Sequence, residues 1–249
     1  MKKYILILII GLGFSSCGIY RQNVVNVPLM QQKGQTQISG HIGFNGYDGQ
    51  AGYALTNNIA VIANYNNLGI KRDGSSTNYS IDKHSFAEIG AGYYKKNKKE
   101  LLTEFFLVAG NGMTSRFVTG GDTIVGHTPL FADFRKVYYN RFLIQADFGK
   151  LHGKFEYAFS PRIFFINYYN IEDNATDEYK HVSSSYLYSD IALTTRYNFA
   201  KYFKISGQVS LTIPLTGYKV AYYEASPING SIGLIINMNF FRPDDKKKE

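Results

Sequence analysis

Apolar and polar residues alternate along most of the chain from Gln35 onward. The clearest case is the last such segment, in which every second position is apolar: Ile232, Leu234, Ile236, Met238 and Phe240. Polar or small residues fill most of the positions between them. Because neighbouring side chains on a strand point to opposite faces, this period predicts β-strands with one apolar and one polar face.

Ten segments fit this description. They are predicted as strands at residues 35–44, 49–56, 58–68, 83–95, 100–112, 139–149, 153–169, 184–199, 202–215 and 228–241. Most reach the ~9–11 residues that a strand needs to cross a bilayer, whereas strands of soluble proteins usually have ~5–6. Length therefore favours membrane-spanning strands.

The connections between these segments alternate in length. Those after the second, fourth, sixth and eighth strands are tight, and those after the third, fifth, seventh and ninth are long, at residues 69–82, 113–138, 170–183 and 216–227. Short turns on one side and long loops on the other are typical of outer-membrane barrels, whose short turns face the periplasm. The pattern predicts an all-β fold, an antiparallel transmembrane up-and-down β-barrel over residues 35–241.

Three alternatives stay open at this point. Residues 35–56 are rich in glycine, so eight strands would also fit. The 113–138 connection could hold a short helix near residues 129–136. Alternation by itself would also describe a soluble, lipid-anchored β-sandwich.

The first seventeen residues predict export. Lys2 and Lys3 precede an apolar run at residues 4–12, which is too short to span a bilayer as a helix but fits a signal peptide. Cys17 is the single cysteine, so no disulfide can form within the chain. The sequence Ser15-Ser16-Cys17 resembles the lipobox of bacterial lipoproteins. That resemblance implies cleavage of the signal peptide 1–16 and a covalent lipid on Cys17, with no other cofactor.

Residues 17–34 show no clear period and are interpreted as a lipidated periplasmic tether. Residues 18–23 contain no acidic side chain. In some lipoproteins acidic residues after the cysteine direct the anchor to the cell surface, so their absence favours an anchor that faces the periplasm.

The last strand ends in Asn237-Met238-Asn239-Phe240-Phe241, and a charged tail follows at residues 242–249. An aromatic-ended last strand is similar to the signal read by the barrel-assembly machinery. Together with the lipobox, the pattern resembles small lipid-anchored outer-membrane β-barrels of Bacteroidota-like Gram-negative bacteria. The resemblance implies a place in the outer membrane, contact with its lipid and lipopolysaccharide, and an envelope protein as a partner.

Composition refines this picture. The chain has 21 Tyr and 18 Phe but no Trp, and on long alternating strands many of these rings are expected to face lipid and the membrane interfaces. The formal charge is +8. The basic residues are mostly dispersed, and for an exported protein anionic headgroups are the expected counter-charge, so nucleic acid is not predicted as a partner.

No catalytic or metal motif is found. His84 and Ser85 are adjacent, but on a strand they point to opposite faces and cannot form a dyad. The acidic stretch 172–178 offers oxygen ligands without the spacing of a calcium loop. An outer-membrane hydrolase therefore stays only as an alternative, and neither catalytic nor metal residues are predicted.

The polar faces of the strands predict a charged network inside the barrel. Its candidate members are Glu88, Glu104, Asp147, Lys154, Glu156, Arg196 and Lys204. An interior of eight to ten strands is narrow enough for side chains to fill. We therefore predict a closed, non-enzymatic barrel with a structural or interaction role, such as that of an accessory subunit of an envelope complex. The alternative is a narrow pore for small solutes.

Overall fold

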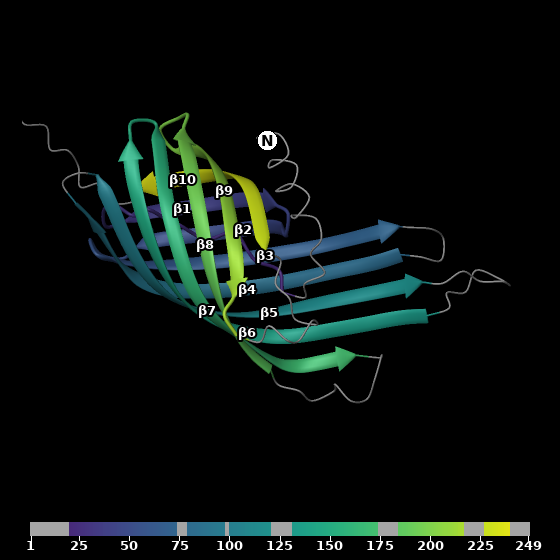
Figure 1. The fold of residues 1–249 in the computed structure, drawn as a ribbon. Coiled ribbons are helices and arrows are strands. Elements are labelled where there is room, and N and C mark those ends of the chain that lie inside the picture. Colours follow the sequence, from purple (N-terminus) through teal and green to yellow (C-terminus); the bar gives the residue numbers. More distant parts are fainter. Residues whose placement is uncertain are drawn as a thin grey trace, which may run out of the picture.

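A computed structural model describes residues 20–73, 79–97, 100–120, 131–173, 184–216 and 227–239 of the 249-residue chain. Ten antiparallel strands form a closed barrel, in which each strand pairs with its neighbours in the chain and β1 pairs with β10 (Figure 1). The strands are β1 (Gln35–Gly43), β2 (Gly46–Ala54), β3 (Ile59–Asp73), β4 (Tyr79–Lys96), β5 (Leu101–Gly120), β6 (Phe131–His152), β7 (Phe155–Asp173), β8 (Ser184–Asn198), β9 (Phe203–Pro214) and β10 (Ile228–Asn239). The prediction of an all-β, ten-stranded barrel is confirmed, and the eight-stranded and sandwich alternatives are wrong.

The two ends of the barrel differ. At one end the strands are joined by tight turns such as residues 153–154, between β6 and β7. The longer connections lie at the other end, with the exception of the β1–β2 turn, where Gly46 has a φ of +109° that L side chains rarely adopt. We call these the short-turn end and the loop end.

The wall of the barrel is uneven in height. β1 and β2 have 9 residues each, whereas β5 has 20 and β6 has 22. The extra residues extend at the loop end, where β5 and β6 stay paired up to Gly120 and Phe131 (Figure 1). The predicted loop 113–138 is therefore largely strand, and the helix considered near residues 129–136 is wrong. In this extension polar residues occur on both faces of the strands, so the sequence shows no alternation of apolar and polar positions. The pairing of β5 with β6 nevertheless continues to the end of the extension.

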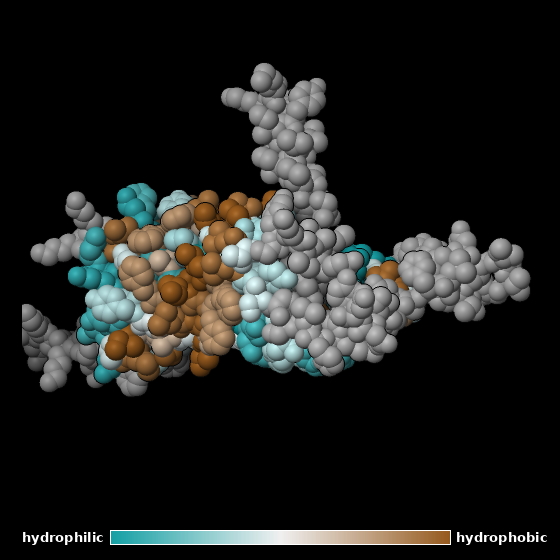
Figure 2. All heavy atoms as spheres, turned by 60° about the horizontal axis from the view of Figure 1, so that its bottom comes forward, coloured by the Kyte–Doolittle hydropathy of each residue, from teal (hydrophilic) through white to brown (hydrophobic). Residues whose placement is uncertain are grey.

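The outer face carries an apolar belt. Figure 2 shows apolar residues gathered around one part of the barrel, between more polar ends. Large side chains in this belt are widely exposed, among them Leu107 at 66%, Ile89 at 68% and Ile232 at 70%. An apolar surface of this extent is not stable in water, so it needs hydrocarbon around it. Among the described residues, no helix is long and apolar enough to span a membrane.

Candidate functional site

The lumen of the barrel is occupied by the chain itself. The segment from Tyr20 to Met30 runs inside the wall, and a turn that ends at Gly34 leads from it into β1; we call residues 20–34 the lumenal segment. It forms no regular helix or strand beyond an isolated bridge at Tyr20 and a turn before β1. Its residues from Gln22 to Met30 are buried. The tether predicted for residues 17–34 is thus, from Tyr20 onward, a filling of the barrel.

The lumenal segment runs from the loop end to the short-turn end. The backbone oxygen of Gln22 accepts hydrogen bonds from Asn45 in the β1–β2 turn (3.1 Å) and from Asn229 at the start of β10 (3.2 Å). Twelve residues later, the backbone nitrogen of Gly34 donates to the oxygen of Ala54, where β2 ends (2.8 Å). The chain then turns, and β1 runs back toward the loop end.

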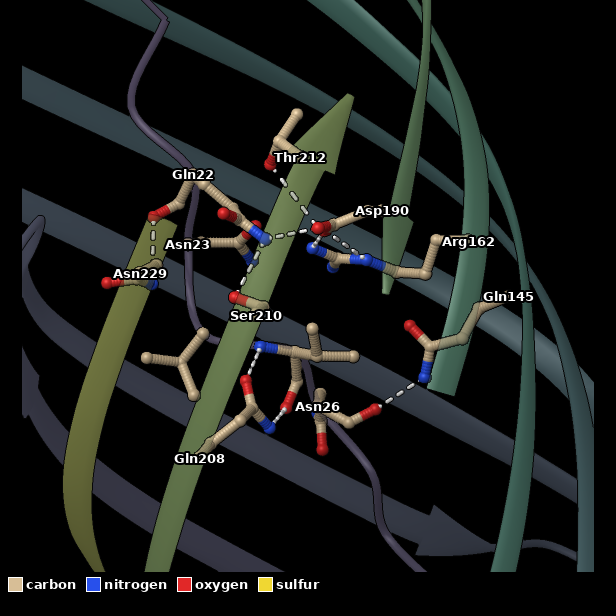
Figure 3. Close-up of polar contacts among 12 residues, drawn as sticks. Gln22, Asn23, Asn26, Gln145, Arg162, Asp190, Gln208, Ser210, Thr212 and Asn229 are labelled. Carbon is tan, nitrogen blue, oxygen red and sulfur yellow. Dashed lines mark hydrogen bonds and ion pairs between the residues drawn. The ribbon is translucent and has the colours of Figure 1, made fainter. Parts of the chain in front are cut away.

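Barrel side chains bind the backbone of the lumenal segment. Gln208 on β9 bonds both polar groups of Val25, accepting from its nitrogen at 2.7 Å and donating to its oxygen at 3.0 Å (Figure 3). Gln50 donates to the oxygen of Val24, and Gln145 donates to that of Asn26. An extended segment without strand partners needs such contacts, because a buried backbone group without a hydrogen bond is costly.

A charged and aromatic cluster holds the loop end of the segment. Arg141 forms a buried ion pair with Glu88 and donates to the hydroxyl of Tyr20 and to the side-chain oxygen of Asn23. Its guanidinium lies 4.2 Å from the ring centroid of Phe86. A buried charged pair is tolerated only when both partners have further hydrogen bonds. Arg141 has them to Tyr20 and Asn23, and Glu88 accepts hydrogen bonds from Asn23 and Asn64.

Gln22 contacts a second ion pair. Arg162 on β7 pairs with Asp190 on β8, and both side chains are at most 1% exposed. The Gln22 amide donates to Asp190 at 2.5 Å and to Ser210 at 2.9 Å (Figure 3). The lumenal segment thus completes the hydrogen bonding of a carboxylate that would otherwise face an empty lumen.

Two groups of charges lie toward the short-turn end. Glu104 accepts from the backbone nitrogens of Leu29 (3.0 Å) and Met30 (2.6 Å), and it lies opposite Asp147 on the neighbouring strand. Glu156 contacts Lys204 at 2.6 Å and Arg196 at 3.7 Å. Arg196 also donates to the oxygen of Val27.

The structure places six of the seven predicted network residues inside the barrel. Glu88, Glu104, Asp147, Glu156, Arg196 and Lys204 are buried on the inner face. They do not form one network: Glu156, Arg196 and Lys204 make one group, Glu104 and Asp147 another, and Glu88 belongs with Arg141. Lys154 was wrongly predicted to be a member, because it lies in the exposed β6–β7 turn, where alternation no longer determines the face.

The sequence analysis did not identify two arginines that form buried ion pairs in the lumen, Arg141 with Glu88 and Arg162 with Asp190. Arg141 and Arg162 lie on polar faces of their strands, so parity could have identified them. The lumenal segment gave a weaker signal, since Val24, Val25, Val27 and Leu29 among Asn and Gln show neither strand nor helix period. Cys17, the signal peptide 1–16 and the tail 242–249 lie outside the described residues.

Two histidines among the described residues lie on the inner face of the barrel. His84 is held between Asn66 and Tyr139, each at 2.7 Å, so both ring nitrogens are engaged. His41 is buried on β1 beside Gly233, while His127 and His181 lie outside the described residues. Across the described ranges, no three His, Cys, Asp or Glu side chains come together as a metal site.

No protein-family model and no curated protein matches the chain. Among solved structures, it is similar to the outer membrane protease OmpT from Escherichia coli, with a TM-score of 0.48 and 10% identity over 82% of this chain and 90% of that one. It is also similar to the translocator domain of the autotransporter NalP from Neisseria meningitidis, with a TM-score of 0.46 and 11% identity over 81% and 86% of the two chains. Acinetobacter baumannii CarO2 gives a TM-score of 0.31 and 10% identity over 82% and 98%. At such low identity, these similarities concern the fold alone and say nothing about the activity of this chain.

Proposed function

We propose that this protein is an outer-membrane lipoprotein whose barrel is closed by its own lumenal segment, and that its role is structural or interactive. The closed barrel and its apolar belt support a place in the outer membrane. The lipobox at Ser15-Ser16-Cys17 supports a lipid on Cys17. Outer-membrane lipid and lipopolysaccharide are its surroundings, and the barrel-assembly machinery inserts it.

One observation supports the proposal that the lumen is closed. The lumenal segment is bound along its length by side chains from several strands, including Gln50, Glu104, Gln145 and Gln208. A solute would have to replace these hydrogen bonds to pass. The same arrangement argues against an open pore, which needs a continuous path of water.

The uneven wall supports an interaction role. β5 and β6 extend well beyond β1 and β2 at the loop end, where they form a paired sheet outside the apolar belt. A rigid sheet that projects from a membrane can contact another envelope protein without motion of loops. We infer that an accessory subunit of an envelope complex is the best description of the function.

Conductance tests the closed state. The full chain, reconstituted in a planar bilayer, is expected to give no discrete current steps. A variant that lacks residues 20–31 is expected to give steps, since the lumen then holds water. Because this deletion could prevent folding, a full-length variant with Glu104→Ala, Gln145→Ala and Gln208→Ala gives a second route to an unplugged lumen. Steps from the unaltered chain would support the pore alternative and overturn the proposal.

Co-purification tests the interaction role. The protein, extracted from native membranes in a mild detergent, is expected to migrate with another envelope protein. Recovery as a free monomer under conditions that preserve other envelope complexes would contradict this part of the proposal.

A further inference from the structure

A polar pocket lies at the short-turn end of the barrel. Its volume is about 370 Å³, at the small end of the ~300–1,000 Å³ that ligand pockets usually have. The residues that line it are all polar: Gln31, Gln32, Gln35, Asn198, Lys201, Tyr202, Lys204 and Asn237. Two of them are lysines and none is acidic, so the pocket fits a small ligand that carries a negative charge.

Several parts of the chain build this pocket. The end of the lumenal segment, the β8–β9 turn and the short-turn ends of β1, β8, β9 and β10 all contribute to its lining. Hydrogen bonds hold these parts together. The side-chain oxygen of Gln35 accepts from the backbone nitrogen of Gln31 (2.8 Å), and the backbone nitrogen of Asn237 donates to the oxygen of Tyr202 (2.9 Å). The pocket is therefore formed in advance, which lowers the cost of ordering it around a ligand.

The charges beside the pocket favour an anion. Lys204, whose side chain is 10% exposed, contacts the carboxylate of Glu156 at 2.6 Å. Arg196 shares the same carboxylate at 3.7 Å, so one acidic side chain faces two cations. Lys201 adds another amino group in the exposed β8–β9 turn. A carboxylate in the pocket would give the two lysines of the lining an oppositely charged partner.

The amide side chains of the lining narrow the class of ligand. Each amide carries both a donor and an acceptor, as the peptide bond does, whereas an ionised phosphate or carboxylate offers acceptors alone. Gln32 and Asn237 can therefore pair with the polar groups of a peptide backbone, while Lys201 and Lys204 match its terminal carboxylate. This combination fits the carboxyl-terminal end of a peptide.

We propose that this pocket binds the carboxyl-terminal end of a peptide in the periplasm. The inference rests on the proposed place in the outer membrane, in which short turns face the periplasm, and it deepens the interaction role by naming the chemistry of the partner. Two sources carry this chemistry, since L-residues end protein chains and D-residues end the peptides of the cell wall. Because the end of the lumenal segment lines the pocket, the bound peptide contacts the segment that closes the barrel.

Saturation-transfer NMR tests the pocket. The full chain in detergent micelles is mixed with N-acetyl-L-alanyl-L-alanine or with N-acetyl-D-alanyl-D-alanine. Each acid is compared with its carboxamide, which lacks the negative charge. At least one acid is expected to give a methyl signal several-fold above that of its carboxamide, and the chirality that binds identifies the source of the peptide.

Two exposed lysines at the short-turn end give matched variants. Lys201→Gln removes an amino group from the pocket and is expected to lower the signal of the bound acid several-fold. Lys154→Gln is the control, because Lys154 lies in the β6–β7 turn at the same end and does not line the pocket. Both side chains are exposed, so neither change is expected to disturb folding, and urea titration of the two variants checks this.

The outcomes separate the pocket from the proposed function. No signal, equal signals from acids and carboxamides, or a signal that Lys201→Gln leaves unchanged would overturn the peptide site. A signal that appears only after removal of residues 242–249 would also overturn it, because the chain's own tail, with Asp244 and Asp245, would then be the occupant. The closed, structural role fails on different evidence, namely current steps from the unaltered chain or its recovery as a free monomer.

Discussion

At the scale of single residues, the lumen depends on charges that are buried in pairs. The side chains of Arg141 and Glu88 are at most 2% exposed, and each also binds Asn23 of the lumenal segment. Removing one partner of such a pair leaves the other charge buried without compensation. Stability should therefore respond far more to the loss of one charge than to the loss of both.

Arg141→Met is expected to lower the free energy of unfolding by about 3–5 kcal/mol, because Glu88 would stay buried and unpaired. Adding Glu88→Met should recover a large part of that loss. Urea titration of the barrel in lipid vesicles measures both.

The control for this prediction is Arg72→Met. Arg72 pairs with Asp82 at 3.0 Å, but its side chain is 57% exposed, so the expected loss is only about 0–1 kcal/mol. Equal losses for Arg141→Met and Arg72→Met would contradict a special role for the buried pair.

At the scale of elements, the lumenal segment is part of the folded barrel although it is not one of its strands. It has no strand ladder, and side chains of the wall replace the hydrogen bonds that a neighbouring strand would give. The segment should therefore be as inaccessible to solvent as the wall itself. This inaccessibility to solvent is expected of the whole segment, because many contacts along it contribute.

Thiol labelling measures this accessibility. In a Cys17→Ser background, Val25→Cys is expected to resist a charged methanethiosulfonate reagent in the folded protein, because Val25 is 1% exposed. Lys154→Cys, in the exposed β6–β7 turn, should react rapidly. Fast labelling at residue 25 would mean that the segment leaves the lumen.

Element boundaries show what sequence can and cannot predict here. The strand predicted at residues 202–215 is confirmed as β9, and sequence could predict it because lipid on one side and a polar lumen on the other impose a period of two. Where β5 and β6 extend past the membrane, lipid no longer selects one face, and the period fades. The site was harder to predict, because the partners of Gln22 or Asn26 lie on strands far away in the sequence.

At the scale of the whole molecule, the apolar belt determines how deeply the barrel sits in the bilayer. Leu107 and Ile89 lie on neighbouring strands within the belt, while Leu55 lies in a turn at the short-turn end. The cost of a charge on the outer face depends on depth, from about 2–4 kcal/mol at the midplane to about 0–1 near the interfaces.

Leu107→Arg is accordingly expected to lower the free energy of unfolding in lipid vesicles by about 2–4 kcal/mol. Leu55→Arg, at a turn, should change it by at most about 1 kcal/mol. Urea titration in vesicles compares the two, and a larger loss at residue 55 would show that the belt is placed wrongly.

The closure of β1 on β10 also has a consequence for biogenesis. The first and last strands meet at this seam, so the wall cannot close until the end of the chain has been made. The lumenal segment is synthesised before all ten strands, yet it ends up inside them. We expect the sheet to curl around a segment that has already been made, with polar side chains such as Gln208 meeting their partners as the curvature forms. In this protein the occupant precedes the barrel and can act as the template on which it closes.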